Sequence, residues 1–311
     1  MKRIVTLTFC PAIDKSTTVE KLLPEKKLSC SMPTYEPGGG GINIARAIHQ
    51  LGGNALAVYP AGGCSGKTFQ TLLKEESVPQ ICIPTKSHTR ENLVVVETAT
   101  ARQYRFGMPG PPLSVQELEN ILSQISQLNN FTYLVVSGSV PHGLPVNLFQ
   151  RLVEIVAKKE AKLVVDTAGD ALKQAVDAGV FLIKPNLKEL VALTSKPLKS
   201  RNSIIQAAKQ LIASGRCELI MVSMGYKGAM LITPDSVQAL AAPKVKVKST
   251  VGAGDSMLAG MLFSIANGIP LSDAFLYAVA CGTAATLNPG TELCHASDVH
   301  DMAQKIKRVQ I

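Results

Sequence analysis

Short apolar runs alternate along the chain with longer stretches in which apolar residues recur at helical spacing. The runs predict strands at Ile4–Phe9, Ala55–Tyr59, Tyr133–Ser137, Leu163–Asp166, Phe181–Ile183 and Leu219–Ser223. The periodic stretches predict helices at Ile42–Leu51, Val115–Leu128, Leu148–Lys158, Ala171–Ala178 and Ile204–Ser214. Such alternation is typical of a mostly parallel sheet with helices on both faces. The pattern therefore predicts a three-layer α/β fold, in which ligands bind beyond the carboxyl ends of the strands.

Two segments interrupt this alternation. Residues 14–36 are polar and rich in Ser and Thr without a helical period, and residues 89–106 have the pattern of a hairpin with arms Glu91–Glu97 and Gln103–Phe106. A small sheet without helix cover leaves one face exposed and needs a partner. We therefore expect these segments to form a β lid over the site that also makes the contact of a homodimer.

Composition and charge limit the number of domains and the kinds of ligand that are expected. No linker divides the 311 residues, so a single domain over residues 1–311 is expected. The net charge of +9 suits an anionic ligand. The basic residues are scattered, however, and no cluster reaches the roughly five to eight expected of a nucleic-acid tail. Nucleic acid is therefore not an expected partner.

The same composition indicates a cytoplasmic protein. The seven Cys are dispersed without a CxxC pair, which fits reduced thiols and argues against a disulfide framework or a structural zinc site. No apolar run approaches the ~18 residues of a membrane span, so no membrane contact is expected. The first residues lack the pattern of a signal peptide.

The first candidate for chemistry is the glycine run Gly38–Gly41, which precedes the helix predicted from Ile42. Consecutive glycines let the backbone approach a ligand closely, and a helix N-terminus supplies amide donors. Asn43 offers a donor and an acceptor to sugar hydroxyls. The alternative interpretation is a flexible turn, but the run directly abuts a well-formed helix and favours binding.

The segment Pro60–Thr68 resembles a phosphate-binding P-loop, because it follows a strand and contains Gly66-Lys67-Thr68. The spacing fails, since Ala61 stands where the motif requires its first glycine. An ordinary strand-to-helix turn explains the segment better.

The third candidate is Ser249–Ser256, which precedes the apolar stretch Met257–Ala266. Gly252, Ala253 and Gly254 would place backbone amides at a helix start, where they can bind a transferring phosphoryl group. Asp255 follows in the first turn and can accept the proton of an attacking hydroxyl. A helix-capping Asp is the alternative, but caps rarely need small residues on both sides. The pattern favours catalysis.

Asn186 and Glu189 follow the strand Phe181–Ile183 and share one helix face. An amide and a carboxylate there can orient Mg²⁺ through its waters. The same spacing is that of a capping box, which taken alone is the stronger interpretation. Lys27, Arg90 and Arg105 lie in the two lid segments and together suit the phosphate of a phosphorylated substrate.

These segments together resemble the PfkB (ribokinase-like) carbohydrate kinase family. Gly38–Ala45 with Gly52, and Ser249–Ser256, match its two signatures in the right order, and Asn186–Glu189 matches its NxxE magnesium motif. The resemblance covers essentially the whole chain and implies a ribokinase-like fold. The wider family often has Asp where Ser249 stands; a Ser there also occurs in the branch that acts on sugar phosphates.

The resemblance implies a role for each matching residue. Asp255 would be the catalytic base, with the Gly252, Ala253 and Gly254 amides at the transferring group. Sugar hydroxyls would contact Asp14, Gly39, Gly40 and Asn43, and the substrate phosphate would contact Arg90, Ser139 and Lys27, the last from a partner subunit. The ATP site would be lined by Lys184, Asn186, Ser223, Gly225, Gly228, Gly252 and Thr283. A K⁺ ion would be bound by Ser249, Val251, Ala285, Asn288 and Gly290, mostly through carbonyls.

The implied activity is transfer of the γ-phosphoryl group of ATP to the 1-hydroxyl of fructose 6-phosphate, with Mg²⁺ bridging the phosphates. The same chemistry on tagatose 6-phosphate or fructose 1-phosphate is an alternative, because one sequence does not reveal how the pocket distinguishes them. A non-catalytic sugar-phosphate sensor is a second alternative, since fold does not fix function. A nucleotide hydrolase that uses Lys67 is a third.

Overall fold

A ten-stranded sheet forms the centre of the molecule in the computed structural model, which describes residues 3–309. Its strand order is β14-β13-β12-β11-β10-β9-β8-β1-β4-β5, and the pairs from β11 to β5 are parallel. β12, β13 and β14 extend it antiparallel at one edge. The strands are β1 (Arg3–Leu7), β4 (Ala55–Ala61), β5 (Gln80–Pro84), β8 (Phe131–Ser137), β9 (Lys162–Asp166), β10 (Val180–Ile183), β11 (Cys217–Ser223), β12 (Ala229–Ile232), β13 (Val237–Ala241) and β14 (Lys307–Arg308).

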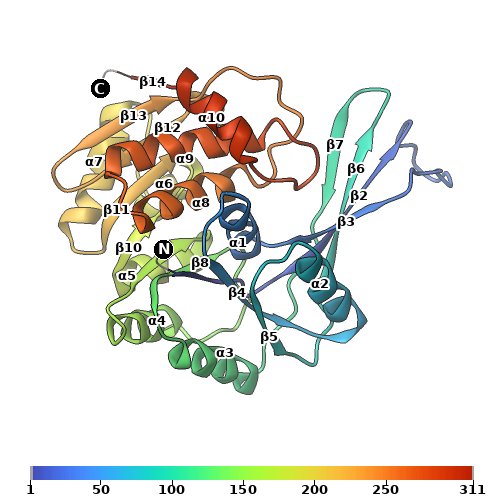
Figure 1. Cartoon of the computed structure of the whole chain (residues 1–311), viewed down its shortest axis with the longest axis horizontal. Helices are drawn as coiled ribbons and strands as arrows, with labels where there is room; N and C mark the ends of the chain where they lie inside the picture. Colours follow the sequence, from blue (N-terminus) through green and yellow to red (C-terminus); the bar gives the residue numbers. More distant parts are fainter. Residues whose placement is uncertain (1–2, 310–311) are drawn as a thin grey trace.

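Helices cover both faces of this sheet (Figure 1). Along β1, Val5 and Leu7 belong to one buried cluster and Ile4 to another, as the alternation of side chains along a strand requires. The first cluster contains α3 (Val115–Gln127), α4 (Leu148–Ala157), α5 (Gly169–Ala178), α6 (Leu187–Thr194) and α7 (Arg201–Ala213). The second contains α1 (Gly40–Gln50), α2 (Gly63–Glu75), α8 (Ala253–Ala266), α9 (Leu271–Ala285) and α10 (Ala296–Lys305). The predicted three-layer α/β fold is confirmed.

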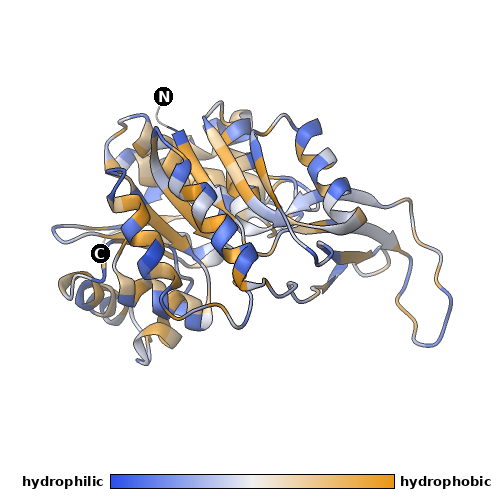
Figure 2. Ribbon diagram, turned by 90° about the horizontal axis from the view of Figure 1, so that it is seen from below, coloured by the Kyte–Doolittle hydropathy of each residue, from blue (hydrophilic) through white to orange (hydrophobic). Residues whose placement is uncertain are grey.

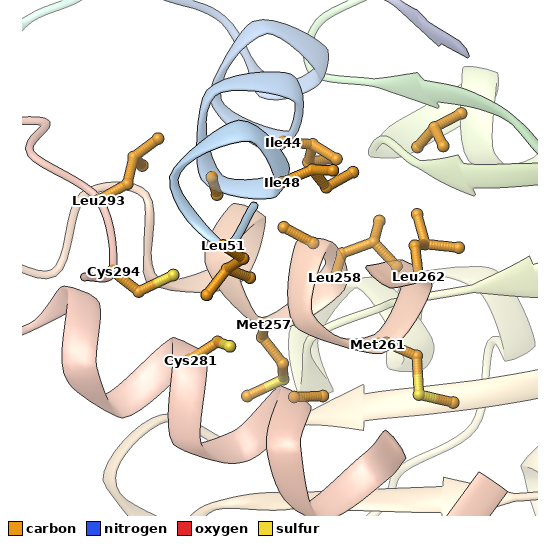
Figure 3. Close-up of a cluster of buried hydrophobic side chains, with 14 of the residues drawn as sticks. Ile44, Ile48, Leu51, Met257, Leu258, Met261, Leu262, Cys281, Leu293 and Cys294 are labelled. Carbon is orange, nitrogen blue, oxygen red and sulfur yellow. The ribbon is translucent and has the colours of Figure 1, made fainter. Parts of the chain in front are cut away.

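Helix α8 lies at the centre of the second cluster and is buried on nearly all sides. Figure 3 shows Ile44 and Ile48 of α1 above Leu258 and Leu262 of α8. On its other side α8 contacts α9, where the Sγ of Cys281 would lie 2.5 Å from a Cβ placed on Gly260. A helix packed this closely cannot shift without repacking its neighbours.

A separate four-stranded sheet projects from the body (Figures 1 and 2). Its order is β3 (Thr34–Gly38), β2 (Ala12–Val19), β6 (Arg90–Glu97) and β7 (Arg102–Phe106). It is the small sheet expected from residues 14–36 and 89–106. β2 runs parallel to β6, from Ala12 opposite Arg90 to Val19 opposite Glu97. Tyr35 and Phe106 are exposed on it.

The observed elements refine some sequence-based boundaries. Helix α1 begins at Gly40 rather than Ile42, so two of the signature glycines lie within its first turn. The short helix η1 (Gly225–Lys227) connects β11 to β12. No helix within residues 3–309 combines the length and apolarity that crossing a bilayer requires.

Candidate active site

The N-terminus of α8 is built to leave its amides available. The N-cap residue, Gly252, has a φ of 71°, in the left-handed region that favours glycine, and no side chain caps the helix. The amides of the first helical turn have no carbonyl partners within the helix and carry a partial positive charge. Gly252, Ala253 and Gly254 therefore leave backbone amides able to donate to an anion, and we refer to them as the anion-binding turn, the role that the sequence predicts for them.

Asp255 follows in the first turn and meets Asn43 from the other signature. The Asn43 side-chain amide donates a hydrogen bond of 2.8 Å to Oδ2 of Asp255. Burial raises the pKa of the Asp255 carboxyl, while the bond from Asn43 and the charge of Lys184 lower it. The Oδ1 of Asn43 is buried without a partner, which leaves an acceptor for a ligand hydroxyl. Two segments far apart in sequence thus place a carboxylate and an amide together.

The glycine run lets the start of α1 approach the strand ends. A Cβ on Gly40 would lie 2.6 Å from the backbone nitrogen of Gly138, just after β8, and a Cβ on Gly41 would lie 2.5 Å from Oγ1 of Thr8. Gly39 has a φ of 113°, which an L side chain rarely adopts. This close approach brings Asn43 to Asp255.

A buried ion pair lies beside this turn. Nζ of Lys184, at the end of β10, is 3.2 Å from Oδ2 of Asp166, at the end of β9. The same Nζ would lie 3.0 Å from a Cβ on Gly254, so the ammonium group lies against the anion-binding turn. Burial lowers the pKa of Lys184, but the carboxylates of Asp166 and Asp255 outweigh it and the pKa is raised. Lys184 is therefore a fixed positive charge at the start of α8.

Asp166 was not singled out in the sequence. Burial raises its pKa to about 6, against the charge of Lys184, and the nearby Asp255 and Glu189 add to the rise. Its position at the carboxyl end of a predicted strand was the signal that could have identified it.

Asn186 and Glu189 form the capping box of α6. Oδ1 of the Asn186 side chain accepts from the backbone amide of Glu189 at 3.0 Å, and Oε2 of Glu189 accepts from the backbone amide of Asn186 at 2.8 Å. The capping box, which was the alternative to a magnesium site, is thus present. Glu189 also lines a cavity of about 710 Å³ together with Asp166 and Ser139. Carboxylate oxygens that face one cavity suit a hydrated Mg²⁺. Glu189 therefore stays a candidate for holding this ion through water although it also caps α6.

The small sheet contributes a second group of polar side chains. Oδ1 of Asp14 on β2 accepts from the amide of Asn92 on β6 at 2.8 Å, and burial raises the pKa of Asp14. Arg90 donates to the carbonyl oxygens of Met108 and Cys10 at 2.8 and 3.0 Å. Its Nε is buried without a partner. Asn92 was also missed, because a mid-strand Asn has no distinguishing pattern.

Arg105 connects the small sheet to the anion-binding turn. Its guanidinium contacts Oγ1 of Thr250 at 3.4 Å, two residues before Gly252. By contrast, Lys27 is exposed in the loop between β2 and β3. Ser139 is exposed at the mouth of the cavity, just after β8. The structure thus brings Arg105 to the candidate site from the small sheet, whereas the side chain of Lys27 is exposed to solvent.

The remaining residues expected at the nucleotide have identifiable structural surroundings. Ser223 ends β11 and donates its amide to the carbonyl of Pro185, beside Asn186. Gly225 begins η1, and a Cβ on Gly228 would lie 1.9 Å from the carbonyl oxygen of Leu240. The Thr283 hydroxyl donates to the carbonyl of Val279 within α9. The close packing at Gly228 is enough to explain why a glycine stands at this position, and no role in binding a nucleotide is needed for that.

Two loops meet where the cation was expected. Oγ of Ser249 donates to the carbonyl of Gly290 at 2.8 Å and accepts from the Val251 amide at 3.2 Å. The Asn288 side-chain amide donates to the carbonyl of Leu293, and the Ala285 carbonyl accepts from the Asn288 amide. Carbonyl and amide oxygens from both loops suit a monovalent cation, although two of these carbonyls already accept hydrogen bonds.

The segment Pro60–Thr68 lacks the geometry of a phosphate-binding loop. A Cβ on Gly62 would lie 2.2 Å from the carbonyl oxygen of Thr85, and one on Gly63 would lie 2.4 Å from the ring of His88. The chain around residues 85–89 therefore occupies the concave side of this turn. This packing supports the interpretation of a strand-to-helix turn.

The fold and these two signatures define a sugar kinase of the ribokinase type. Residues 1–298 match the pfkB family of carbohydrate kinases, and the chain belongs to this family. It is 41% identical over 307 residues to the ATP-dependent 6-phosphofructokinase isozyme 2 of Escherichia coli, covering 98% of both chains.

Solved structures agree with this placement. The structure of phosphofructokinase-2 from Escherichia coli in complex with potassium has a TM-score of 0.94 and 40% identity, covering 98% of this chain and 99% of that one. Its complex with fructose-6-phosphate has a TM-score of 0.92 and 38% identity over the same shares. A third structure, described as the tetrameric inhibited form, has a TM-score of 0.92 and 39% identity, again over these shares.

Proposed function

We propose that the protein transfers the γ-phosphoryl group of ATP to the 1-hydroxyl of fructose 6-phosphate, giving fructose 1,6-bisphosphate. The observation that carries the proposal is the hydrogen bond between Asn43 and Asp255 at the N-terminus of α8. It places a candidate base, a sugar-binding amide and an anion-binding turn in one location. The similarity to a 6-phosphofructokinase over nearly the whole chain supports this choice of substrate.

In this proposal, Asp255 accepts the proton of the 1-hydroxyl as the hydroxyl oxygen attacks the γ-phosphorus, and the bond from that phosphorus to the β–γ bridging oxygen breaks to release ADP. The amides of Gly252, Ala253 and Gly254 donate to the phosphoryl oxygens, where negative charge develops. Lys184 adds a fixed positive charge there, held by Asp166. Phosphoryl transfer depends mainly on positioning and charge stabilisation, and this group supplies both.

The sugar is held between the body and the small sheet. Asp14, Gly39, Gly40 and Asn43 contact its hydroxyls, with the partnerless Oδ1 of Asn43 as one acceptor. Arg90, Arg105 and Ser139 bind the phosphate, and Lys27 reaches it from a partner subunit. Guanidinium groups suit this task because they match the geometry of phosphate oxygens.

The nucleotide lies across the ends of β10 and β11. Lys184, Asn186, Ser223, Gly225, Gly228, Gly252 and Thr283 line its site. Asn186 and Glu189 would hold Mg²⁺ through water, and the ion would neutralise charge on the phosphates. The loops carrying Ser249, Val251, Ala285, Asn288 and Gly290 bind K⁺, and potassium is present in the solved complex of the Escherichia coli enzyme.

The whole chain acts as one kinase domain, with residues of about 14–36 and 89–106 forming its lid. The contact of Arg105 with Thr250 is consistent with such closure. A homodimer through the exposed face of this sheet buries Tyr35 and Phe106 and brings Lys27 to the neighbouring site. The tetrameric form of the Escherichia coli enzyme is compatible with a dimer as its building block.

An ADP-release assay with Mg-ATP and K⁺ tests the proposal. Fructose 6-phosphate, tagatose 6-phosphate, fructose 1-phosphate and fructose are compared by kcat/KM. We expect fructose 6-phosphate to be preferred. A preference for another phosphosugar would retain the mechanism and change the substrate. No sugar-dependent release from folded protein would favour a sensor and refute the kinase assignment.

A further inference from the structure

Glu36 is a carboxylate whose role the proposed chemistry does not explain. It lies on β3 directly opposite Asp14 of β2. Its Oε2 accepts a hydrogen bond of 3.1 Å from the backbone amide of Thr291, in the loop between α9 and α10. Its Oε1 is 3.7 Å from the guanidinium of Arg46 on α1. One side chain thus joins the small sheet to two separate parts of the body.

The loop that Glu36 holds leads to the anion-binding turn. Gly290 precedes Thr291, and its carbonyl accepts the bond from Ser249, which also accepts from the Val251 amide. A Cβ on Gly290 would lie 3.0 Å from Oε2 of Glu36, and its φ is 58°. The loop therefore approaches the carboxylate so closely that a side chain there would displace it. Ser249 is 4% exposed and Thr291 is 3% exposed, so water competes little for these bonds.

The second contact of Glu36, with Arg46, leads toward the residues proposed to bind the sugar. Arg46 lies one turn after Asn43 on α1, and its side chain is 4% exposed. Asn43 in turn donates to Asp255 on α8. A path therefore runs from Glu36 to Arg46, along the backbone of α1 to Asn43, and across a hydrogen bond to Asp255 in the first turn of α8. It returns through Ser249, Gly290 and Thr291 (Figure 1 shows the loop after α9 extending toward the small sheet).

We propose that Glu36 is a positioning residue that couples the sugar-phosphate site to the nucleotide site. The inference rests on the proposed function, because it takes the small sheet and Asn43 as the sugar side and the start of α8 as the nucleotide side. A ligand that pulls the small sheet toward the body tightens the Thr291 bond, and this sets the loop that supports the anion-binding turn. Coupling is reciprocal, so nucleotide binding strengthens sugar-phosphate binding by the same factor.

Arg46 provides the matched control. Besides Glu36, its guanidinium pairs at 2.6 Å with Glu76, the C-cap residue of α2, and donates to the carbonyl of Pro37 at 2.9 Å. Glu76→Gln removes one carboxylate from Arg46 but leaves the Thr291 contact. Glu36→Ala removes both contacts of Glu36, and Glu36→Gln keeps the shape and an acceptor for Thr291 while removing the charge. Because Arg46 retains Glu76 in both Glu36 variants, it is not left as an unpaired buried charge.

The test measures coupling by calorimetry. The Kd of the sugar phosphate that the ADP-release assay selects is measured with and without saturating Mg²⁺ and a non-hydrolysable ATP analogue. Linked sites typically differ about 5- to 150-fold in affinity. We expect a factor in this range for the wild type and for Glu76→Gln, and a factor below about 2-fold for Glu36→Ala. Glu36→Gln is expected to lie between them and serves if the Ala variant folds poorly.

Several results would overturn the inference. A wild type without coupling, a Glu36→Ala variant that keeps the wild-type factor, or equal loss in Glu36→Ala and Glu76→Gln would each do so. The last result would mean that the loss of any carboxylate partner of Arg46 has the same effect, whether or not the Thr291 contact is kept. A failure of the proposed function is distinguishable, because the wild type would then show no sugar-dependent ADP release, whatever coupling factor calorimetry gives.

Discussion

Replacing Asp255 by Asn tests the core of the proposed mechanism. The substitution keeps the size of the side chain and an oxygen that can accept from Asn43, but it removes the ability to take a proton at neutral pH. A positioned general base contributes about 10²- to 10⁴-fold in rate. Each tenfold change is about 1.4 kcal/mol, so the variant is expected to lose about 3 to 5.5 kcal/mol of transition-state stabilisation.

The structure predicts that this loss is confined to catalysis. Burial raises the pKa of Asp255, so its charge is not favoured by the folded state, and an amide there should not lower the free energy of unfolding. Lys184 keeps its ion pair with Asp166. We therefore expect kcat to fall by at least 10²-fold, with nearly unchanged Tm and ATP Kd.

The assay combines ADP release at saturating substrates with calorimetric ATP binding. Asp273→Asn is the matched control, because Asp273 also lies in the first turn of a helix, α9, but is exposed. It should keep wild-type turnover. If Asp255→Asn retained kcat within about tenfold of wild type, Asp255 could not be the base.

Two further predictions concern Asp166 and Lys67. The pKa of Asp166 is raised to about 6, so its carboxylate, the partner of Lys184, is lost as pH falls through about 6. kcat should fall in the same range, and Asp166→Asn should lower kcat at pH 8 and flatten this acid limb; an unchanged limb would contradict the assignment. Because the folded-state pKa exceeds the unfolded value, protonation of Asp166 favours the folded state, so Tm measured alongside should not fall on this account. Lys67→Ala should leave kcat within about twofold in the same ADP-release assay, since the turn around it is filled by residues 85–89; lost turnover would instead support a P-loop hydrolase.

Most of the parallel part of the fold could be predicted from sequence because its strands are short apolar runs between amphipathic helices, but the edge strand β5 was missed. The helix α9 could not, since it is buried between α8 and α10 and its apolar residues show no single face. The antiparallel pair β12 and β13 was also missed. These strands are only four and five residues long, too short for a clear alternation.

The residues of the candidate site also fall into a predictable group and a group that the sequence does not reveal. Asp255, Asn43 and the glycines lie in local motifs whose chemistry depends on neighbours in sequence. Glu36 and Asn92 gain their significance only from contacts across the sheet or with distant loops, such as the bond from Thr291 to Glu36. Nothing in a single sequence marks such residues, because their partners are set by tertiary packing.

The burial of α8 has a consequence for how the enzyme can vary over evolutionary time. The candidate base lies on the helix that makes the most extensive contacts with α1 and α9, so substitutions that loosen this core also misplace the reacting group (Figure 3). Selection for activity therefore also constrains the packing of α8. The small sheet lies outside this packed core, so its residues other than Asp14, Glu36, Arg90 and Arg105 are less constrained, and changes of substrate preference within the family are expected to arise there.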